Sequence, residues 1–315
     1  MSEAPQAAIQ VRNLTRRFGE FVAVDDLTFD VRAGEIFGFL GPNGAGKTTT
    51  IKMLTGLLKP SAGHGMVAGF RLPEERSQVR SRIGYMSQKF SLYDDLTVGE
   101  NIELFAGLYG VTGPRFQARR SWILEMAQLE GREQRLTSEL PLGFKQRLAL
   151  GSAMLHEPQV LFLDEPTSGV DPGARRRFWD LIHELAAAGT TILVSTHYME
   201  EAESCDRLAL LNRGRLIALD TPRNLRLAMP ESIYRVRTPD AVNVVGGLAS
   251  DGQVVDAALF GREIHVVMDP AAGADAVTDL LVRHGLPAES GSLIDPSLED
   301  VFVSYVRRAG GAVVS

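Results

Sequence analysis

The stretch Gly41-Pro42-Asn43-Gly44-Ala45-Gly46-Lys47-Thr48 decides the fold of this 315-residue chain. Its pattern, Gly-x-x-x-x-Gly-Lys-Thr, follows an apolar run at residues 36–40 that predicts a buried strand. It precedes residues 49–58, which predict a helix. Glycines let successive backbone N–H groups turn toward anionic oxygens, and the start of a helix adds a positive dipole end. The sequence therefore predicts a loop that binds nucleotide phosphates. The alternative is a glycine-rich turn that binds nothing.

Side chains in this loop have predicted roles of their own. Lys47 can reach the β- and γ-phosphates of a nucleoside triphosphate, and the Thr48 hydroxyl can ligate Mg²⁺. The residues predicted to hold the nucleotide here are Gly41, Pro42, Asn43, Gly44, Ala45, Gly46, Lys47, Thr48 and Thr49.

Two acidic residues follow a second apolar run, residues 160–163. Such a short, continuous run predicts a strand covered on both faces. Asp164, at the mouth of that strand, can hold Mg²⁺ through water opposite Thr48. Glu165 would then serve as general base or as the group that positions the attacking water. The alternative is a pair of ordinary surface carboxylates.

Two more polar residues stand at predicted strand ends. His197 follows the run 191–194 through Ser195 and Thr196, where ligands bind in parallel sheets, and it can donate a hydrogen bond to the γ-phosphate. Gln88 ends the predicted strand 83–87, and its amide can reach both Mg²⁺ and the water. From position alone, an ordinary exposed glutamine is the alternative for Gln88.

Composition limits the class of protein. The formal net charge is -6 and the pI is about 5.6, which argues against a nucleic-acid partner held by bulk charge. No apolar run is long enough to span a bilayer, and the first ten residues do not resemble a secretory signal. Cys205 is the single cysteine, so no internal disulfide can form, which suits a reducing cytosol.

The chain changes character near Pro222. Before it, residues 9–219 alternate strand-like and helix-like segments, which predicts a largely parallel sheet flanked by helices. Thr97 and Glu100 predict a capping box at the start of a mainly helical region, and further helices are predicted at 116–129 and 144–155. After it, strands at 232–237 and 263–268 and a helix at 274–284 predict a small α+β domain, reached through a linker helix that Pro230 closes.

In their order, these motifs resemble those of the ATP-binding subunit of ABC transporters, over about residues 9–219. The resemblance includes the loop 41–48, Gln88, residues 161–171 and His197. It implies an α/β P-loop NTPase with a mostly parallel sheet, an antiparallel β subdomain and a helical subdomain at about 89–155. We expect an ATP-binding domain at residues 1–222 and an accessory or regulatory α+β domain at 223–315.

Two family positions differ from the usual residues. The family stacks an aromatic ring on adenine, and Phe18 occupies that place, with a plain core role as the alternative. The family signature Leu-Ser-Gly-Gly-Gln reads Leu140-Pro141-Leu142-Gly143-Phe144 here, followed by Lys145, Gln146 and Arg147. Gly143 and Gln146 still match. We expect a working but altered contact with the nucleotide of a partner subunit. A degenerate, non-hydrolysing site is the alternative, although intact Glu165 and His197 argue against it.

The resemblance also implies what the protein works with. It implies ATP and Mg²⁺, ligated by Thr48, Gln88 and Asp164, and a homodimer with Asp171 at its seam. Hydrolysis would power a separate integral-membrane permease from the cytoplasmic face of the inner membrane, with no nucleic acid involved. The signature and the tail 295–302 are similar to those of bacterial multidrug or antibiotic exporters. We expect the tail domain to steady the dimer or regulate it.

Three residues after Gln88 are candidate contacts for the permease: Phe90, Leu92 and Tyr93. Local packing is an equal alternative for them. At the level of function, the alternatives are a soluble ABC ATPase acting on ribosomes or DNA, and an ATP-binding regulator that does not hydrolyse ATP.

Overall fold

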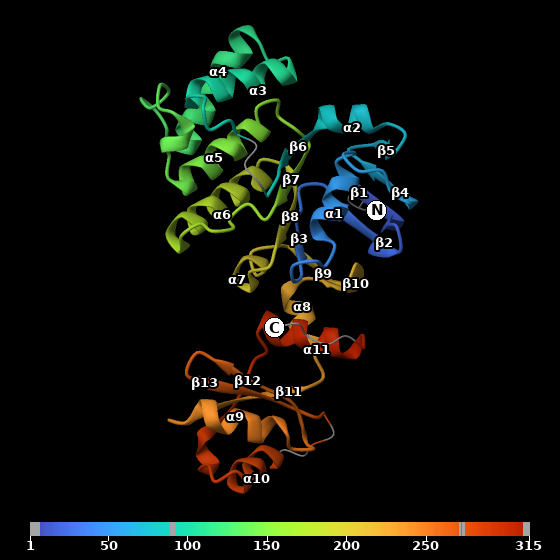
Figure 1. Cartoon of the computed structure of the whole chain (residues 1–315), viewed down its shortest axis with the longest axis vertical. Coiled ribbons are helices and arrows are strands. Elements are labelled where there is room, and N and C mark those ends of the chain that lie inside the picture. Colours follow the sequence, from blue (N-terminus) through green and yellow to red (C-terminus); the bar gives the residue numbers. More distant parts are fainter. Residues whose placement is uncertain (1–6, 89–91, 271, 273–274, 311–315) are drawn as a thin grey trace, which may run out of the picture. The chain divides into compact units, whose positions relative to one another are not determined.

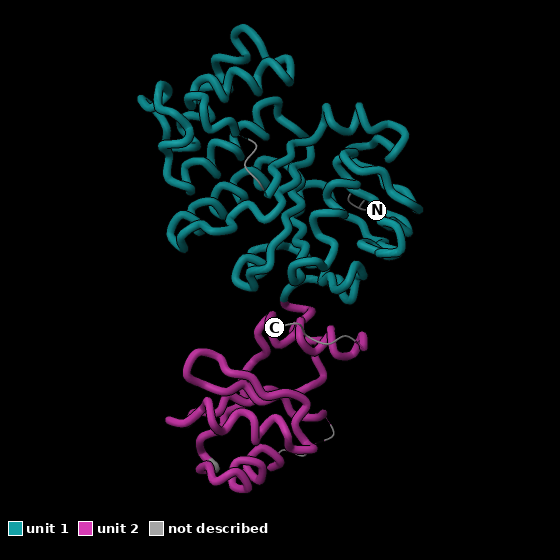
Figure 2. Tube along the Cα trace, in the orientation of Figure 1, with its two compact units in different colours: residues 1–222, 314–315 teal, residues 223–313 magenta. Residues whose placement is uncertain are grey.

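The structure is a computed structural model of the chain, and it describes residues 7–88, 92–270, 272 and 275–310. The chain forms two compact units that divide after Pro222, shown in teal and magenta in Figure 2.

Unit 1 is built on a six-stranded sheet in the order β10-β9-β3-β8-β7-β6 (Figure 1). Its strands are β3 (Ile36–Leu40), β6 (Ile83–Met86), β7 (Val160–Asp164), β8 (Thr191–Thr196), β9 (Arg207–Asn212) and β10 (Arg215–Asp220). All neighbours pair in parallel except β10 with β9. The prediction of a largely parallel sheet is confirmed. Strands β3, β7 and β8 are buried along their whole length, as their continuous apolar runs require.

A second, antiparallel sheet in unit 1 has the order β2-β1-β4-β5. Its strands are β1 (Ala7–Phe18), β2 (Phe21–Arg32), β4 (Ala62–Val67) and β5 (Phe70–Leu72). The ring centroid of Phe29 from this sheet lies 5.5 Å from that of Phe37 and 5.4 Å from that of Phe39, both in β3. This aromatic cluster lies in the core shared by the two sheets.

The helices of unit 1 connect and cover the strands. They are α1 (Lys47–Leu54), α2 (Arg76–Arg82), α3 (Val98–Tyr109), α4 (Gly113–Ala127), α5 (Leu142–Ala153), α6 (Pro172–Ala187) and α7 (Met199–Ala202), with a 3-10 turn η1 (Thr137–Glu139). The predicted capping box is confirmed, because Thr97 and Glu100 hydrogen-bond each other's backbone N–H.

Predicted helix limits were wrong by a few residues. The helix predicted at 49–58 spans 47–54. Gly46, with a φ of 99°, is its N-cap, and left-handed Gly56, with a φ of 69°, lies just after its end. The helix predicted at 116–129 spans 113–127, since Pro114 is tolerated in its first turn and left-handed Gln128 ends it. Likewise, Pro141 starts the helix predicted at 144–155 two residues early.

Unit 2 is a four-stranded antiparallel sheet in the order β12-β13-β11-β14. Its elements are α8 (Pro222–Leu227, which begins at the last residue of unit 1), β11 (Ser232–Arg237), α9 (Ala241–Ala249), β12 (Val254–Phe260), β13 (Glu263–Met268), α10 (Ala276–Arg283), η2 (Ala288–Ser290), β14 (Gly291–Ile294) and α11 (Leu298–Arg308). Helices α9 and α10 lie on one face of this sheet and α11 on the other (Figure 1).

A separate hydrophobic core holds unit 2 together. Val236, Ile264 and Val266 of the sheet pack against Leu248 of α9 and Leu280 of α10. The predicted strands 232–237 and 263–268 are confirmed, and the described part of the predicted 274–284 helix spans 276–283. The linker helix α8 ends at Leu227, before Pro230.

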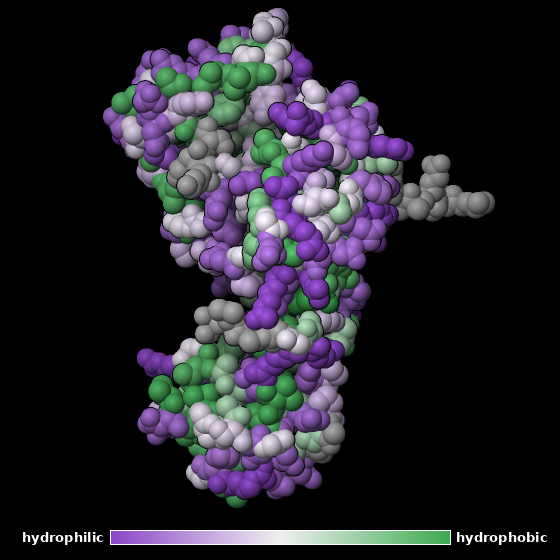
Figure 3. All heavy atoms as spheres, turned by 45° about the vertical axis from the view of Figure 1, so that its right-hand side comes forward, coloured by the Kyte–Doolittle hydropathy of each residue, from purple (hydrophilic) through white to green (hydrophobic). Residues whose placement is uncertain are grey.

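Exposed apolar side chains of unit 2 are dispersed. Leu227, Val242, Leu259, Val282 and Leu293 are each at least 43% exposed and come from five different elements. Figure 3, coloured by hydropathy, shows green and purple residues mixed on the visible face of this unit. Among the described residues, the most exposed apolar side chains of unit 2 therefore do not share one helix or strand.

Candidate nucleotide-binding site

The glycine loop lies between the end of β3 and the start of α1. Gly44 and Gly46 have φ values of 82° and 99°, which a residue with a side chain adopts only under strain. At Gly41 a Cβ atom would lie 2.3 Å from the backbone oxygen of Leu211, so the neighbouring strand excludes any side chain. These positions explain why the loop needs its glycines.

A cavity of about 360 Å³ opens beside this loop, within the usual size range of small-molecule sites. It is lined by Phe21, Ala23, Asn43, Gly44, Ala45, Gly46, Lys47, Thr48, Thr49, Gln88 and Glu165. Gly41 and Pro42 are not in its wall, but their carbonyl oxygens accept hydrogen bonds from the Lys47 ammonium at 2.7 and 3.1 Å. Residues far apart in sequence therefore converge on the predicted loop.

Glu165 is the centre of a buried polar group. Its Oε1 lies 3.2 Å from the ammonium of Lys47, and both side chains are almost fully buried. Its Oε2 accepts a hydrogen bond from the Gln88 amide at 3.0 Å and lies 3.4 Å from Nδ1 of His197. The parallel register of β6, β7 and β8 explains this meeting, because their carboxyl ends share one edge of the sheet.

Asp164 makes a different set of contacts. Its Oδ1 accepts hydrogen bonds from the hydroxyls of Thr48 at 2.9 Å and Ser195 at 2.8 Å. Burial raises the pKa of Asp164, and Glu165 also raises it, whereas Ser195, Thr48 and Lys47 act in the opposite direction. Sequence reasoning missed Ser195, whose only signal is a hydroxyl at the end of a strand two residues before His197.

The second oxygen of Asp164 indicates what Asp164 and Thr48 can bind together. Oδ2 is buried and has no hydrogen-bond partner among the described residues. A carboxylate oxygen beside a threonine hydroxyl suits a hard cation such as Mg²⁺, which prefers oxygen ligands and takes others from phosphates and water. Within the described part of the chain, no cluster of three or more His, Cys, Asp or Glu side chains could hold a metal by itself.

The backbone separates the two acidic side chains. Glu165 has a φ of 48°, a left-handed conformation that is uncommon for a residue other than glycine. Its N–H donates to the Ser195 hydroxyl at 3.0 Å and lies 3.2 Å from the Ser195 carbonyl oxygen. Ser195 therefore stabilises the left-handed backbone at Glu165. As a result, the Asp164 carboxylate contacts Thr48, whereas the Glu165 carboxylate contacts Lys47.

The aromatic residue at the cavity differs from the one expected. Phe18 and Phe21 are cross-strand partners at the turn of the β1–β2 hairpin. Phe21 lines the cavity and is 65% exposed, whereas Phe18 is not in its wall and lies under the Arg16 guanidinium, 4.4 Å from its ring centroid. The family resemblance predicted Phe18 for this place, whereas the structure of the β1–β2 hairpin puts Phe21 in the cavity wall.

The signature segment lies elsewhere in the chain. Gly143 and Gln146 are in the first turns of α5, and neither lines the cavity of the same chain. A Cβ on Gly143 would lie 2.9 Å from Cβ of Ala174 in α6, so close helix packing explains this glycine. Gln146 is buried, and its Oε1 has no hydrogen-bond partner within the described residues. Asp171 caps α6 by accepting the N–H of Ala174 at 2.9 Å.

The candidate permease contacts differ in how exposed they are. Leu92 is buried, so local packing explains it, whereas Tyr93 is 52% exposed. Phe90 lies outside the described residues. None of the helices in the described ranges has both the length and the apolar character needed to cross a membrane.

Comparison with known proteins gives a consistent result. A family model described as "ABC transporter" matches residues 24–168. The chain is 51% identical over 221 residues to "Probable multidrug ABC transporter ATP-binding protein YbhF" of Escherichia coli (strain K12), which covers 70% of this chain but only 38% of that protein. It is 45% identical over 222 residues to "Nod factor export ATP-binding protein I" of Burkholderia lata, covering 70% of this chain and 73% of the relative.

Solved structures agree with these relatives. "Structure of ATP binding subunit of ABC transporter" aligns with a TM-score of 0.64 and 33% identity, over 70% of this chain and 92% of that one. "Dimeric structure of a post-hydrolysis state of the ATP-binding cassette MJ0796 bound to ADP and Pi" aligns with a TM-score of 0.62 and 26% identity, over 68% and 98%. With the glycine loop and the parallel sheet described above, these similarities show that the chain belongs to the ABC transporter family and carries its ATP-binding cassette.

Proposed function

We propose that this protein is the ATP-hydrolysing subunit of an exporter of drugs or other small molecules. It would work as a homodimer on a separate membrane permease, peripheral to the cytoplasmic face of the inner membrane. The observation that carries this proposal is the buried Glu165 carboxylate, in contact with Lys47, Gln88 and His197 at the wall of the cavity.

The chemistry follows from these contacts. Without nucleotide, the Lys47 ammonium is the counter-ion of the Glu165 carboxylate. When ATP binds, its γ-phosphate would become the partner of that ammonium instead. Glu165 would then be free to accept a proton from the attacking water, with Gln88 and His197 orienting that water and the phosphate. Thr48, Asp164 and Gln88 would hold Mg²⁺, which neutralises charge on the phosphates when bound. Hydrolysis to ADP and phosphate completes the cycle.

The dimer is proposed from the signature segment and the related cassette. Gly143 and Gln146 do not line the cavity of their own chain, which suits a contact with the nucleotide of a second copy. The N–H groups at the start of α5 can approach an anion even though Pro141 replaces the hydroxyl residue of the usual signature. A dimeric cassette with ADP and phosphate among the structural neighbours supports this arrangement.

Export is proposed from the printed names of relatives, a multidrug protein and a Nod factor export protein. The chain spans only 38% of the length of the first of these relatives, so the substrate and the permease of this chain are given as proposals. We also propose that residues 1–222 are the ATP-binding domain and 223–315 an accessory domain that steadies or regulates the dimer. The separate core of unit 2 supports this division.

Phosphate release by the full chain with Mg²⁺ and ATP tests the enzyme directly. Glu165→Gln should keep ATP binding, accumulate the ATP-bound dimer and lower turnover by roughly 10² or more, the usual effect of losing a general base. Lys47→Ala should weaken nucleotide binding instead. Glu157→Gln, at an exposed ion pair with Arg115, is the matched control and should leave turnover unchanged.

The altered signature favours one second candidate, an ATP-binding regulator that dimerises without turnover. Pro141 and Leu142 remove a hydroxyl and a glycine from the segment expected to meet the partner's nucleotide. ATP-dependent dimerisation without phosphate release, in the presence of the co-purifying permease, would favour that candidate. Co-purification with ribosomes or DNA instead of a membrane protein would favour a soluble ABC ATPase.

A further inference from the structure

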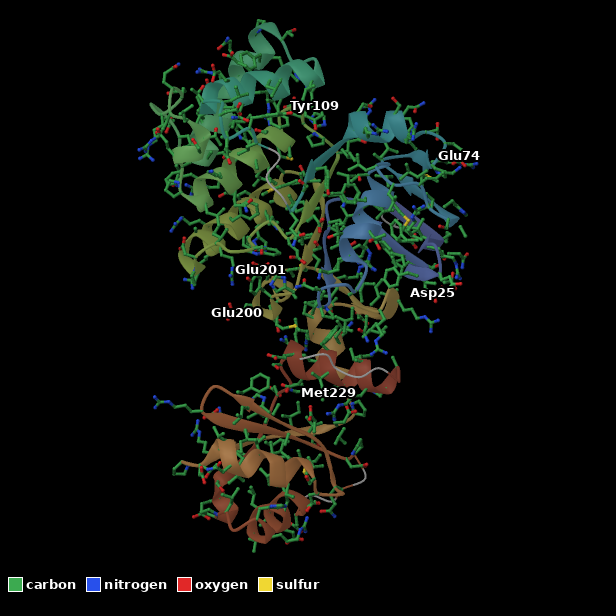
Figure 4. The ribbon with its side chains drawn as sticks, viewed as in Figure 1. Asp25, Glu74, Tyr109, Glu200, Glu201 and Met229 are labelled. Carbon is green, nitrogen blue, oxygen red and sulfur yellow. The ribbon has the colours of Figure 1, made fainter. Side chains whose placement is uncertain are left out.

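Glu201 is a buried carboxylate that has no role in the function proposed above. It lies in α7 and is 3% exposed, whereas its neighbour Glu200 is exposed. Figure 4 labels both residues on this short helix. Because burying a carboxylate is costly unless it is paired and hydrogen-bonded, the partners of Glu201 indicate what it does.

Three separate parts of unit 1 meet at this carboxylate. The hydroxyl of Thr196, at the end of β8, donates to Oε2 at 2.6 Å, and the hydroxyl of Thr167, after β7, donates to Oε1. In α6, Nε of Arg175 lies 3.3 Å from Oε1, an ion-pair distance without an aligned hydrogen bond. Both hydroxyl donors are 1% exposed, so these contacts are protected from water.

The Thr196 contact leads to His197. Besides donating to Glu201, the Thr196 hydroxyl accepts the N–H of Tyr198 at 2.9 Å. This bond spans the backbone on both sides of His197. The Nδ1 of His197, in turn, lies 3.4 Å from Glu165. The Glu201–Thr196 contact is therefore connected, through the backbone on either side of His197, to the imidazole that lies near Glu165.

The other two contacts lead to the segment after Glu165. Thr167 comes two residues after Glu165, and the Ser168 N–H bonds back to the Glu165 carbonyl oxygen at 3.3 Å. Arg175 donates to the Val170 carbonyl oxygen at 3.4 Å, and its guanidinium lies 4.0 Å from the Tyr198 ring centroid. Glu201 thus joins the segment after β7 to the segment after β8.

We propose that Glu201 is a positioning residue that holds His197 and the segment following Glu165 as one unit, so that the two reactive groups keep their relative placement during hydrolysis. Glu201 does not line the cavity, and among the described residues its carboxylate contacts Thr196, Thr167 and Arg175. This inference rests on the ATP hydrolysis proposed above.

The first test compares Glu201→Gln with Glu200→Gln in the full chain. Glu201→Gln should lower kcat roughly tenfold or more, the size of one lost hydrogen bond to a charged group, and leave KM and the Kd for ATP unchanged. Glu200→Gln should match the parent. Equal kcat values for both variants and the parent would overturn the proposal.

A double-mutant cycle separates positioning from general damage. In a His197→Ala background, Glu201→Gln should lower the remaining turnover less than twofold, because the proposed effect is on the relative placement of His197 and Glu165, which no longer matters once the imidazole is gone. A full tenfold loss in both backgrounds would mean that Glu201 only stabilises the fold, and the proposal would be rejected.

A second pair of variants covers the case in which Glu201→Gln does not fold. Thr196→Ser keeps the hydroxyl and should retain parental kcat, whereas Thr196→Val, of nearly the same volume, should lose most of it. Identical kcat for the two would contradict the proposed path to His197.

An NMR measurement is independent of turnover. The imidazole signals of His197, assigned through His197→Ala, should shift or broaden in Glu201→Gln and stay in place in Glu200→Gln. If the parent releases no phosphate but these signals respond, the proposed function fails and the positioning contact stands. If the signals do not respond, the positioning inference fails whatever the turnover.

Discussion

Glu165→Gln should destabilise the protein when no nucleotide is bound, apart from its effect on catalysis. The Lys47 and Glu165 side chains are 4% and 6% exposed, with the ammonium 3.2 Å from the carboxylate. The substitution removes the negative charge that faces a buried cation and leaves the Gly41 and Pro42 carbonyl oxygens as acceptors.

The expected loss can be estimated from these contacts. Removing one partner of a buried ion pair costs about 3–5 kcal/mol. Because the two carbonyl bonds remain and the new amide oxygen can still accept a hydrogen bond, we expect a smaller loss, about 2 kcal/mol. For a domain of this size, each kcal/mol shifts Tm by about 2–4 °C, so the nucleotide-free variant should melt about 4–8 °C lower.

Thermal unfolding of the full chain, followed by circular dichroism with and without Mg²⁺ and ATP, measures this shift. Bound triphosphate restores negative charge beside Lys47, so the gap between variant and parent should close with ATP. Glu157→Gln breaks an exposed pair at 2.9 Å, for which a loss of about 0–1 kcal/mol is typical. An unchanged Tm for nucleotide-free Glu165→Gln, or a gap that ATP does not reduce, would refute the counter-ion argument.

Three further outcomes are expected. Burial raises the pKa of Asp164 in the folded state. The free energy of unfolding should therefore decrease as the pH rises from the ordinary pKa of this group through the raised pKa. Asp164→Asn should therefore raise Tm at neutral pH and flatten that part of the stability–pH curve, while weakening Mg²⁺-dependent nucleotide binding; a lower Tm would contradict this. Gly41→Ala would place Cβ 2.3 Å from the Leu211 carbonyl oxygen and should cost about 1–3 kcal/mol in urea unfolding. Phe21→Ala should weaken binding of a fluorescent ATP analogue more than Phe18→Ala does, because only Phe21 lines the cavity; the reverse order would support the original assignment.

Local patterns were reliable where local physics dominates. The continuous apolar runs of β3, β7 and β8 can be satisfied only by strands covered on both faces, and Thr97 with Glu100 forms a cap within one turn. Helix limits were less reliable. They depend on backbone conformations, such as left-handed Gly46 and Gln128, that several residue types adopt at different cost.

The site divides in the same way. The sequence predicted the loop, Asp164, Glu165, Gln88 and His197 as site residues because each stands at the end of a strand that the apolar pattern indicates, and the structure places them near one another. The sequence did not indicate Phe21, Ser195 or Glu201, because their positions depend on hairpin register or on partners up to 34 residues away. No spacing rule connects such partners before the sheet is assembled.

By itself, the sequence determined that this chain has a phosphate-binding loop, a parallel sheet and acidic groups at the ends of its strands. Glycine positions, continuous apolar runs and capping residues are local patterns that the sequence shows directly. The tertiary structure alone decided which side chains meet: Lys47 with Glu165, Ser195 with Asp164, and Glu201 with Thr196 and Thr167. The physical reason is that parallel pairing of β3, β7 and β8 brings three distant strand ends to one edge, where buried charges must find their partners.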